Sequence, residues 1–425
     1  MSRPARAASS LGLVLMCVIG TMALGAASKG PCASGAWGDL RQYRNLCYTD
    51  VVPLLDTEQL RGSRLPFLDE CVAVEASNCD EYPVVTMYVM RLASWISGDD
   101  YAPFYWVNAL LLTGFAAATA VMLYVANGSR ALYFALAPTL LVYGTVNWDL
   151  VAVAFATAGL LLFFQRRDRG SGVALGLGVA TKLYPAFLLV PLVVQRVRER
   201  RPDGAIVLGW TAVGAWLAVN LPFAAIAPNA WLTFFRFNGE RGADFDSLWY
   251  IACRHLDTCP STRAINGWSL VIFLISSAAV WAIKARRHAG FPRWTLGLPL
   301  IVLFLLSNKV YSPQYGLWLL PWFALALPRL VTFLAFSLTD IAVFVTRFTW
   351  FGRLEGAPGA SQELFEVMVL VRAAVLVWCV VSWIRREHTP TEIERRMSAA
   401  AARQQPSEPP RSPEPPEPAG EVVPA

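Results

Sequence analysis

The feature that most constrains the fold is an apolar stretch that is too short for the topology its flanks require. It covers residues 170–195, between the basic clusters 166–169 and 196–201, and Lys182 lies near its middle. Basic clusters beside apolar segments mark the cytoplasmic side of a membrane, so both ends of the stretch are expected on the same side. Two full crossings need about 40 residues, whereas this stretch has roughly 25.

The chain is therefore expected to enter the membrane here and return without crossing it. At about 1.5 Å per residue, each arm reaches about 15–18 Å, which is half of a ~30 Å hydrocarbon core. The prediction is a half-length hairpin with Lys182 at its tip. Irregular backbone at this depth is tolerated only inside protein or beside a polar cavity, so we expect a cavity that Lys182 faces.

Composition places most of the chain in a lipid bilayer. Of its 425 residues, 56% are hydrophobic and only 16% are charged, which predicts an all-α polytopic membrane protein. The net charge of +6 is concentrated in turns, where membrane topology explains it. Because no basic stripe with interleaved aromatic residues is present, no nucleic-acid partner is expected.

Basic residues between apolar runs predict about 12 membrane segments, with both termini cytoplasmic. The run 11–27 is typical of a signal peptide or of a retained first helix, and retention is favoured because further segments follow. Residues 28–102 are expected to form a first outer loop, in which 84–97 is a helix lying in the interface. Residues 227–265 are expected to form a second outer loop, which is polar. Further crossings are expected, besides the hairpin, at 103–126, 131–146, 148–164, 204–226, 267–283, 294–307, 316–327, 330–346 and 365–383.

These segments make residues 1–386 one transmembrane domain. The remaining tail, 387–425, is charged and then rich in Pro and Glu. Such a composition cannot bury a core, so the tail is expected to be disordered.

The cysteines divide by position. Cys17 and Cys379 lie inside apolar segments, whereas the other six lie in two outer loops. In an oxidising compartment these six are disulfide candidates, and buried free thiols are the alternative: Cys32, Cys47, Cys71, Cys79, Cys253 and Cys259. The four in the first loop allow three connectivities, which the sequence leaves open, and the favoured pair in the second loop is Cys253 with Cys259.

Three short hairpins are expected to place polar tips on the same outer face. These tips are 147–149 (Asn-Trp-Asp), 181–185 (Thr-Lys-Leu-Tyr-Pro) and 307–315. A lysine at membrane depth costs about 2.5–3.5 kcal/mol, so Lys182 and Lys309 are expected to have anionic partners. Two lysines and an aspartate around one cavity suit a phosphate and a sugar. The alternative is that both lysines only extend to the interface.

Carboxylates supply the remaining candidates. Asp50 follows the first helix and Glu81 precedes the interfacial helix. A carboxylate above a membrane cavity can act as general base for a hydroxyl, although acidic loops are also commonly solvated surface. Asp340 and Arg372 lie at similar depth in successive segments, which predicts a buried ion pair. The His and Cys spacing does not favour a metal site.

Five segments taken in order carry a family resemblance. They are 48–50 (Tyr-Thr-Asp), 81–86 (Glu-Tyr-Pro-Val-Val-Thr), 147–149 (Asn-Trp-Asp), 180–185 (Ala-Thr-Lys-Leu-Tyr-Pro) and 308–315 (Asn-Lys-Val-Tyr-Ser-Pro-Gln-Tyr). Over roughly residues 10–385 the chain resembles glycosyltransferase family 87. This is a family of GT-C fold that includes alpha-mannosyltransferases using polyprenyl-phosphate-mannose.

The resemblance implies an activity and roles for particular residues. A sugar, mannose in the first instance, would pass from a polyprenyl-phosphate donor to a lipid or glycan acceptor at the outer face of the plasma membrane, with inversion and without a cofactor. Asp50 matches the catalytic base of the family, and Lys182 and Lys309 would lie near the donor phosphate. The other expected substrate-binding residues are Asn147, Asp149, Gln314, Tyr184, Tyr315, Glu81 and Tyr82. Alternatives are an arabinose transferase and a non-enzymatic transporter of lipid-linked sugars.

Overall fold

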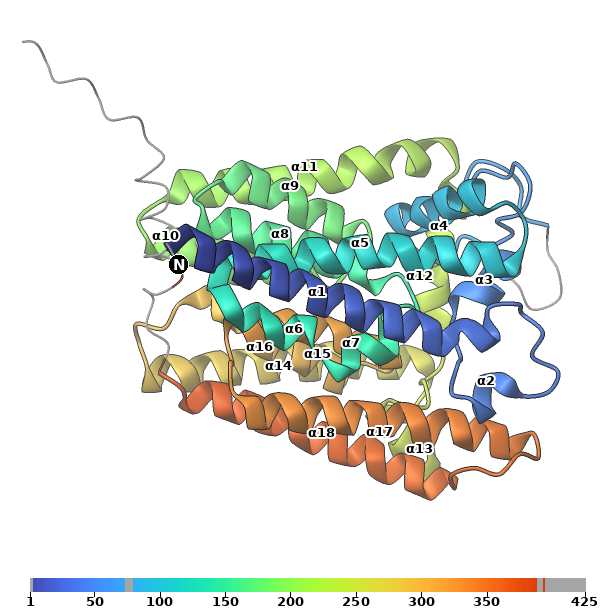
Figure 1. Cartoon of the computed structure of the whole chain (residues 1–425). Coiled ribbons are helices and arrows are strands. Elements are labelled where there is room, and N and C mark those ends of the chain that lie inside the picture. The colour runs from blue at the N-terminus through green and yellow to red at the C-terminus, as the bar shows by residue number, and fades with distance from the viewer. Residues whose placement is uncertain (1–2, 73–78, 388–392, 394–425) are drawn as a thin grey trace, which may run out of the picture.

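The long helices of the protein run side by side and form an all-helical bundle (Figure 1). This computed structural model describes residues 3–72, 79–387 and 393. Within those residues, six helices are long and apolar enough to cross a membrane. They are α1 (Arg3–Lys29), α5 (Tyr101–Asn127), α11 (Pro202–Ile226), α14 (Thr262–Arg287), α17 (Leu330–Leu354) and α18 (Gln362–Arg385). The chain is thus a multi-pass membrane protein, as its composition predicts.

The other expected membrane segments are short helices packed among the long ones. They are α6 (Leu132–Ala135), α7 (Pro138–Tyr143), α8 (Asp149–Phe164), α9 (Asp168–Val179), α10 (Ala186–Arg198), α15 (Gly297–Ser307) and α16 (Leu320–Leu325). The arms α9 and α10 have 12 and 13 residues, and Lys182 lies in the loop between them. This arrangement matches the half-length hairpin predicted from the basic flanks.

Local sequence explains where several of these helices begin and end. The Ser261 and Ser361 side chains accept hydrogen bonds from backbone N–H groups in the first turns of α14 and α18, at 3.3 and 3.2 Å. Pro202 and Pro138 occupy the first positions of α11 and α7, where a missing N–H costs nothing. Gly98, with φ of +74°, ends α4 (Val84–Ser97), the helix predicted over these residues.

Two long connecting segments lie towards the end of the bundle away from the N-terminus (Figure 1). The first carries a 3₁₀ turn (Gly30–Cys32), α2 (Arg41–Arg44), α3 (Val51–Thr57) and α4. The second, between α11 and α14, was expected to be a polar loop but contains α12 (Pro228–Glu240) and α13 (Leu248–His255). These helices form because aromatic side chains of α12 pack on α11, as Trp231 does on Trp216, and because Ser247 caps α13.

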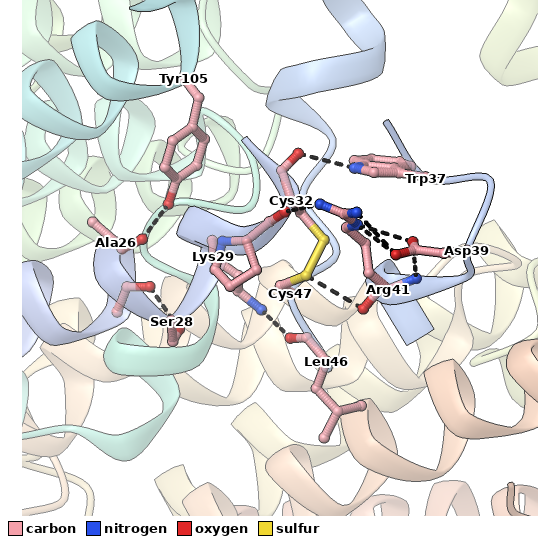
Figure 2. The surroundings of a disulfide bond; sticks show 12 residues. Ala26, Ser28, Lys29, Cys32, Trp37, Asp39, Arg41, Leu46, Cys47 and Tyr105 are labelled. Atoms are coloured by element: carbon pink, nitrogen blue, oxygen red, sulfur yellow. Dashed lines mark hydrogen bonds and ion pairs between the residues drawn. A yellow bond between two sulfur atoms is a disulfide. The ribbon is translucent and has the colours of Figure 1, made fainter. Parts of the chain in front are cut away.

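Disulfides tie these segments together. The structure pairs Cys32 with Cys47, Cys71 with Cys79, and Cys253 with Cys259, and leaves Cys17 and Cys379 as free thiols. Figure 2 shows the first pair beside Lys29, whose Nζ donates to the carbonyl oxygen of Leu46 at 2.9 Å. The end of α1 is therefore fixed to the chain a few residues before Asp50.

Buried ion pairs join the second connecting segment to α17 and α18. Arg372 lies 3.3 Å from Asp340, which is the ion pair expected from their matching depth. Arg372 also donates to the backbone oxygen of Asp246, and Arg347 donates to the carboxylate of Asp246 at 2.6 Å. This network holds the segment between α12 and α13 against the bundle. Apart from residues 387 and 393, the tail that was predicted to be disordered lies outside the described residues.

Candidate active site

A cavity of about 900 Å³ opens among the connecting segments at this end of the bundle. Its wall is formed by the segment before α3, the tip of the α9–α10 hairpin, one face of α12, the segment after α15 and the last turns of α17. Eight of the predicted site residues line it: Asp50, Glu81, Tyr82, Lys182, Tyr184, Lys309, Gln314 and Tyr315. Residues far apart in the sequence therefore converge on one space.

Asp50 lies at the start of α3 with its carboxylate partly exposed to the cavity. The Tyr48 hydroxyl donates to Oδ1 at 2.8 Å, and the Asn147 and Gln314 amides donate to Oδ2 at 2.8 and 3.4 Å. The Asp50 backbone N–H donates to the Val146 carbonyl at 2.9 Å. The carboxylate is thus held in one orientation while one side of it remains open to the cavity.

Burial raises the pKa of the Asp50 carboxyl, and the hydrogen bonds from Asn147 and Tyr48 oppose that rise without cancelling it. A carboxylate of raised pKa is a stronger base than an ordinary aspartate. General bases work best when their pKa lies near the working pH. The geometry and the electrostatics of Asp50 therefore both suit proton acceptance from a bound hydroxyl.

Asn147 lies behind the cavity wall and is fully buried. Its Oδ1 accepts from the Trp148 backbone N–H at 2.7 Å, and its Nδ2 donates to Asp50 and to the Tyr82 hydroxyl, the latter at 2.9 Å. The backbone contact fixes which end of the amide faces the carboxylate. The Asn147 amide is thus occupied in orienting Asp50, and its contact with a sugar stays a prediction.

Asp149 also lies behind the wall, fully buried at the first position of α8. A negative charge is favoured there because the N-terminus of a helix carries partial positive charge. Trp318 Nε1 donates to its Oδ1 at 2.7 Å, and Lys182 Nζ lies 3.7 Å from its Oδ2. Asp149 is thus the anionic partner expected for Lys182 and is itself shielded from the cavity.

Lys182 points its ammonium group into a space bounded by aromatic rings. Nζ lies 4.9 Å from the centre of the Tyr82 ring and 5.7 Å from that of Tyr315. It also lies 3.4 Å from Asn147 Oδ1. The amide of Asn147 therefore connects Lys182 to the carboxylate of Asp50.

A stack of three rings forms the wall beside this lysine. Trp318 stacks on Tyr184 at 4.4 Å and on Tyr315 at 4.1 Å between ring centres. Flat aromatic surfaces beside polar groups suit the faces of a sugar ring. Trp318 was not predicted from the sequence, although its position three residues after Tyr315 in a short hairpin was a signal for it.

A second group of cations lines another part of the cavity. Lys309 is buried, and its Nζ donates to the Gly239 carbonyl at 3.2 Å. Burial and then the nearby Arg241 lower the pKa of Lys309. Among the described residues, no carboxylate lies within 4 Å of its Nζ, whereas Arg241 pairs with Asp244 at 3.5 Å. Lys309 is thus a buried cation whose charge is not balanced by an ion pair.

Arg347 lines the cavity as well, and sequence reasoning missed it. It lies on α17 beyond residue 346, where this segment was expected to end. A single arginine at the end of an apolar run was the available signal, since charges in such positions are commonly functional. In the described part of the chain, no three His, Cys, Asp or Glu side chains gather in a way that could hold a metal ion.

The sequence profile described as Glycosyltransferase family 87 matches residues 81–307, just over half of the chain. The matched region includes the tips that carry Asn147, Asp149 and Lys182 but ends before Lys309 and begins after Asp50. A search of curated proteins finds no match.

Two solved structures show a distant likeness. The crystal structure of ArnT from Cupriavidus metallidurans bound to undecaprenyl phosphate has a TM-score of 0.42 and 13% identity, over 94% of this chain and 79% of that one. The apo structure of the same protein has a TM-score of 0.37 and 14% identity, over 77% of this chain and 70% of that one.

Proposed function

The chain belongs to glycosyltransferase family 87, and on that premise we propose that it moves a sugar from a polyprenyl-phosphate donor to a lipid or glycan hydroxyl. The observation that carries the proposal is the Asp50 carboxylate, held by Tyr48, Asn147 and Gln314 at the wall of the cavity. Mannose is the first sugar to test, because the motifs of the chain resemble those of mannosyltransferases.

In the proposed reaction, Asp50 accepts the proton of the acceptor hydroxyl. The acceptor oxygen attacks the anomeric carbon, and the bond between that carbon and the phosphate oxygen breaks. The lipid phosphate leaves with the electron pair, and the configuration at the carbon inverts. Because a phosphate leaves as an anion, one base is sufficient and cations take the place of a general acid.

Lys309 and Lys182 are the proposed partners of the donor phosphate. Lys309 is the stronger candidate, because its buried charge lacks a carboxylate among the described residues and an uncompensated buried charge favours an anionic ligand. Lys182 already has Asp149 at 3.7 Å, so its charge is partly neutralised before any ligand binds. The two lysines would then differ in effect, with Lys309 governing donor affinity more strongly.

The ring stack of Tyr184, Trp318 and Tyr315 is the proposed platform for the sugar, with Gln314 as a hydrogen-bond partner. Glu81 and Tyr82, which line the same cavity, would border the acceptor. We assign Asn147 and Asp149 to support rather than to sugar contact, since each is fully buried and bonded to the residue it positions.

We place the cavity on the outer face of the plasma membrane, with both termini in the cytoplasm. All three disulfides belong to segments at the cavity end of the bundle. Disulfides persist in oxidising compartments, and the basic turns at the opposite end favour the cytoplasmic side.

The test is sugar transfer by the full-length protein purified into lipid. Labelled polyprenyl-phosphate-mannose is supplied with a lipid extract of the host as acceptor, and polyprenyl-phosphate-arabinose runs in a parallel arm. We expect labelled lipid or glycan product from one donor, lost in Asp50→Asn. Transport of either donor between leaflets without any product, in the presence of the full extract, would contradict the proposal.

A further inference from the structure

A second cavity, of about 880 Å³, opens at the other end of the bundle, between α8, α9 and α11. Its inner wall is apolar, and the apolar residues recur at helical spacing on two facing helices. On α8 they are Phe155, Ala158 and Leu162, on α9 they are Gly170, Val173, Ala174 and Leu177, and α11 adds Val207. Each of the two stripes extends over eight residues, a rise of about 10 Å along the helix axis. The cavity is thus a groove that runs from the end of the bundle towards its middle.

The mouth of this groove is strongly basic. Four arginines line it, namely Arg166, Arg167, Arg169 and Arg201. Two helices also begin there, α9 at Asp168 and α11 at Pro202. The first turn of a helix has free N–H groups and partial positive charge, so both termini add to the attraction for an anion.

The carboxylates at the mouth do not cancel this charge. Asp168 is engaged at 2.6 Å by Arg196, which lies outside the groove, and at 3.7 Å by Arg201. Asp203 is exposed at the rim. One guanidinium nitrogen of Arg201 is buried and has no hydrogen-bond partner in the described part of the chain. The mouth thus keeps an excess of positive charge, with four arginines against two aspartates.

We propose that this groove binds one molecule of an anionic phospholipid. Its phosphate headgroup would lie among the arginines at the mouth, and one acyl chain would lie along the stripe between Leu162 and Phe155. Charge complementarity selects an anionic lipid over a zwitterionic one, because the headgroup of a zwitterionic lipid also carries a positive charge, which the arginines repel. This site is separate from the proposed transfer reaction and does not depend on it.

The experiment measures lipid binding to the full-length protein. Protein in detergent micelles is titrated with dioleoyl phosphatidylglycerol or with dioleoyl phosphatidylcholine, and bound lipid is counted by native mass spectrometry. We expect one phosphatidylglycerol to bind in clear preference to phosphatidylcholine. A basic residue near a membrane surface contributes about fivefold to the affinity for anionic lipid, so Arg167→Gln with Arg169→Gln should weaken this binding about 25-fold.

Two further variants distinguish lipid binding in the groove from lipid binding to any positively charged surface. Arg286→Gln with Arg287→Gln removes two exposed arginines at the end of α14, outside the groove, and should leave the affinity unchanged. Val173→Trp keeps every arginine but fills the groove with a large side chain at a partly exposed position, and should abolish the preferential site. Elution volume and helical content verify that each variant is folded.

Equal affinity of the native protein for the two lipids would overturn the proposal, as would equal losses in the two double-arginine variants. Retained binding in folded Val173→Trp would show that the acyl chain does not use this groove.

Discussion

Replacing Tyr48 by Phe tests how the cavity controls its proposed base. The change removes one oxygen, the one that donates to Asp50 Oδ1 at 2.8 Å, and keeps the ring that stacks on Phe348 at 4.5 Å between centres. A hydrogen bond to a charged group contributes about 1.5–3 kcal/mol. Since about 1.4 kcal/mol is a factor of ten, the ionised form of Asp50 should become about 10- to 100-fold less favourable relative to the protonated form.

The direction of the effect follows from the role of a base. Burial already raises the pKa of Asp50, and Tyr48 is one of the donors that oppose this rise. Without that donor the pKa rises further, so the acid limb of the rate profile moves to higher pH. In Tyr48→Phe the rate of transfer should be low at acidic pH and recover as the pH increases, whereas in Asp50→Asn it should stay low at every pH.

The assay is the initial rate of sugar transfer between pH 5 and 9, at saturating donor. The matched control is Tyr43→Phe, which also removes a hydroxyl from the cavity wall beside Phe348, but one with no hydrogen bond among the described residues. Its profile should match the native one. An unshifted acid limb in Tyr48→Phe, or a loss equal at all pH values, would refute the view that Tyr48 acts through the charge of Asp50.

Three further changes test other parts of the structure. Lys309→Ala should raise the KM for donor about 10- to 100-fold with a smaller effect on kcat, because it removes a charged contact to the phosphate; an unchanged KM would exclude that contact. Asp149→Asn should lower the free energy of unfolding by about 3–5 kcal/mol, because it leaves Lys182 without its anionic partner. Adding Lys182→Met to the same chain should restore part of this lost stability in thermal melts. If the double variant instead loses the sum of the stabilities lost by the two single variants, the two side chains are not coupled. Cys32→Ser with Cys47→Ser opens a loop of 15 residues and should cost about 3 kcal/mol of stability; an unchanged melting temperature would argue against a structural role.

The hairpin around Lys182 was predictable because it depends only on the length of an apolar stretch and on the basic clusters beside it. The number of apolar residues between two basic clusters limits how far the chain can enter a membrane, and the structure forms two short arms with Lys182 between them. The convergence of the polar tips followed for the same reason. Each tip lies opposite a basic turn, so all of them reach the same end of the bundle.

The sequence did not predict which side chains of a tip face the cavity. Asn147 and Asp149 lie in the same tip as Trp148, yet all three are fully buried, and the two polar ones act on Asp50 and Lys182. The direction of each side chain depends on packing against segments distant in sequence, and periodicity carries no information on this.

Tertiary contacts also explain what the sequence left open. Residues 227–265 contain glycines and charges that are typical of a loop, but Trp231 packs on Trp216 and stabilises α12. Arg347 extends an apolar helix into the cavity because Asp244 and Asp246, from another segment, neutralise it. The connectivity of four cysteines likewise depends on how the loop folds and not on their spacing.

Asp50 is the proposed base of the cavity, and one comparison tests this role most directly. Transfer and donor binding are measured side by side for Asp50→Asn and for Asp56→Asn, a control that alters an exposed aspartate on the neighbouring α3. We predict that Asp50→Asn lowers transfer by about 10²- to 10⁴-fold with donor binding retained, and that Asp56→Asn does not. Full transfer by a folded Asp50→Asn protein would contradict the account and would direct attention to Glu81, the other carboxylate at the cavity wall.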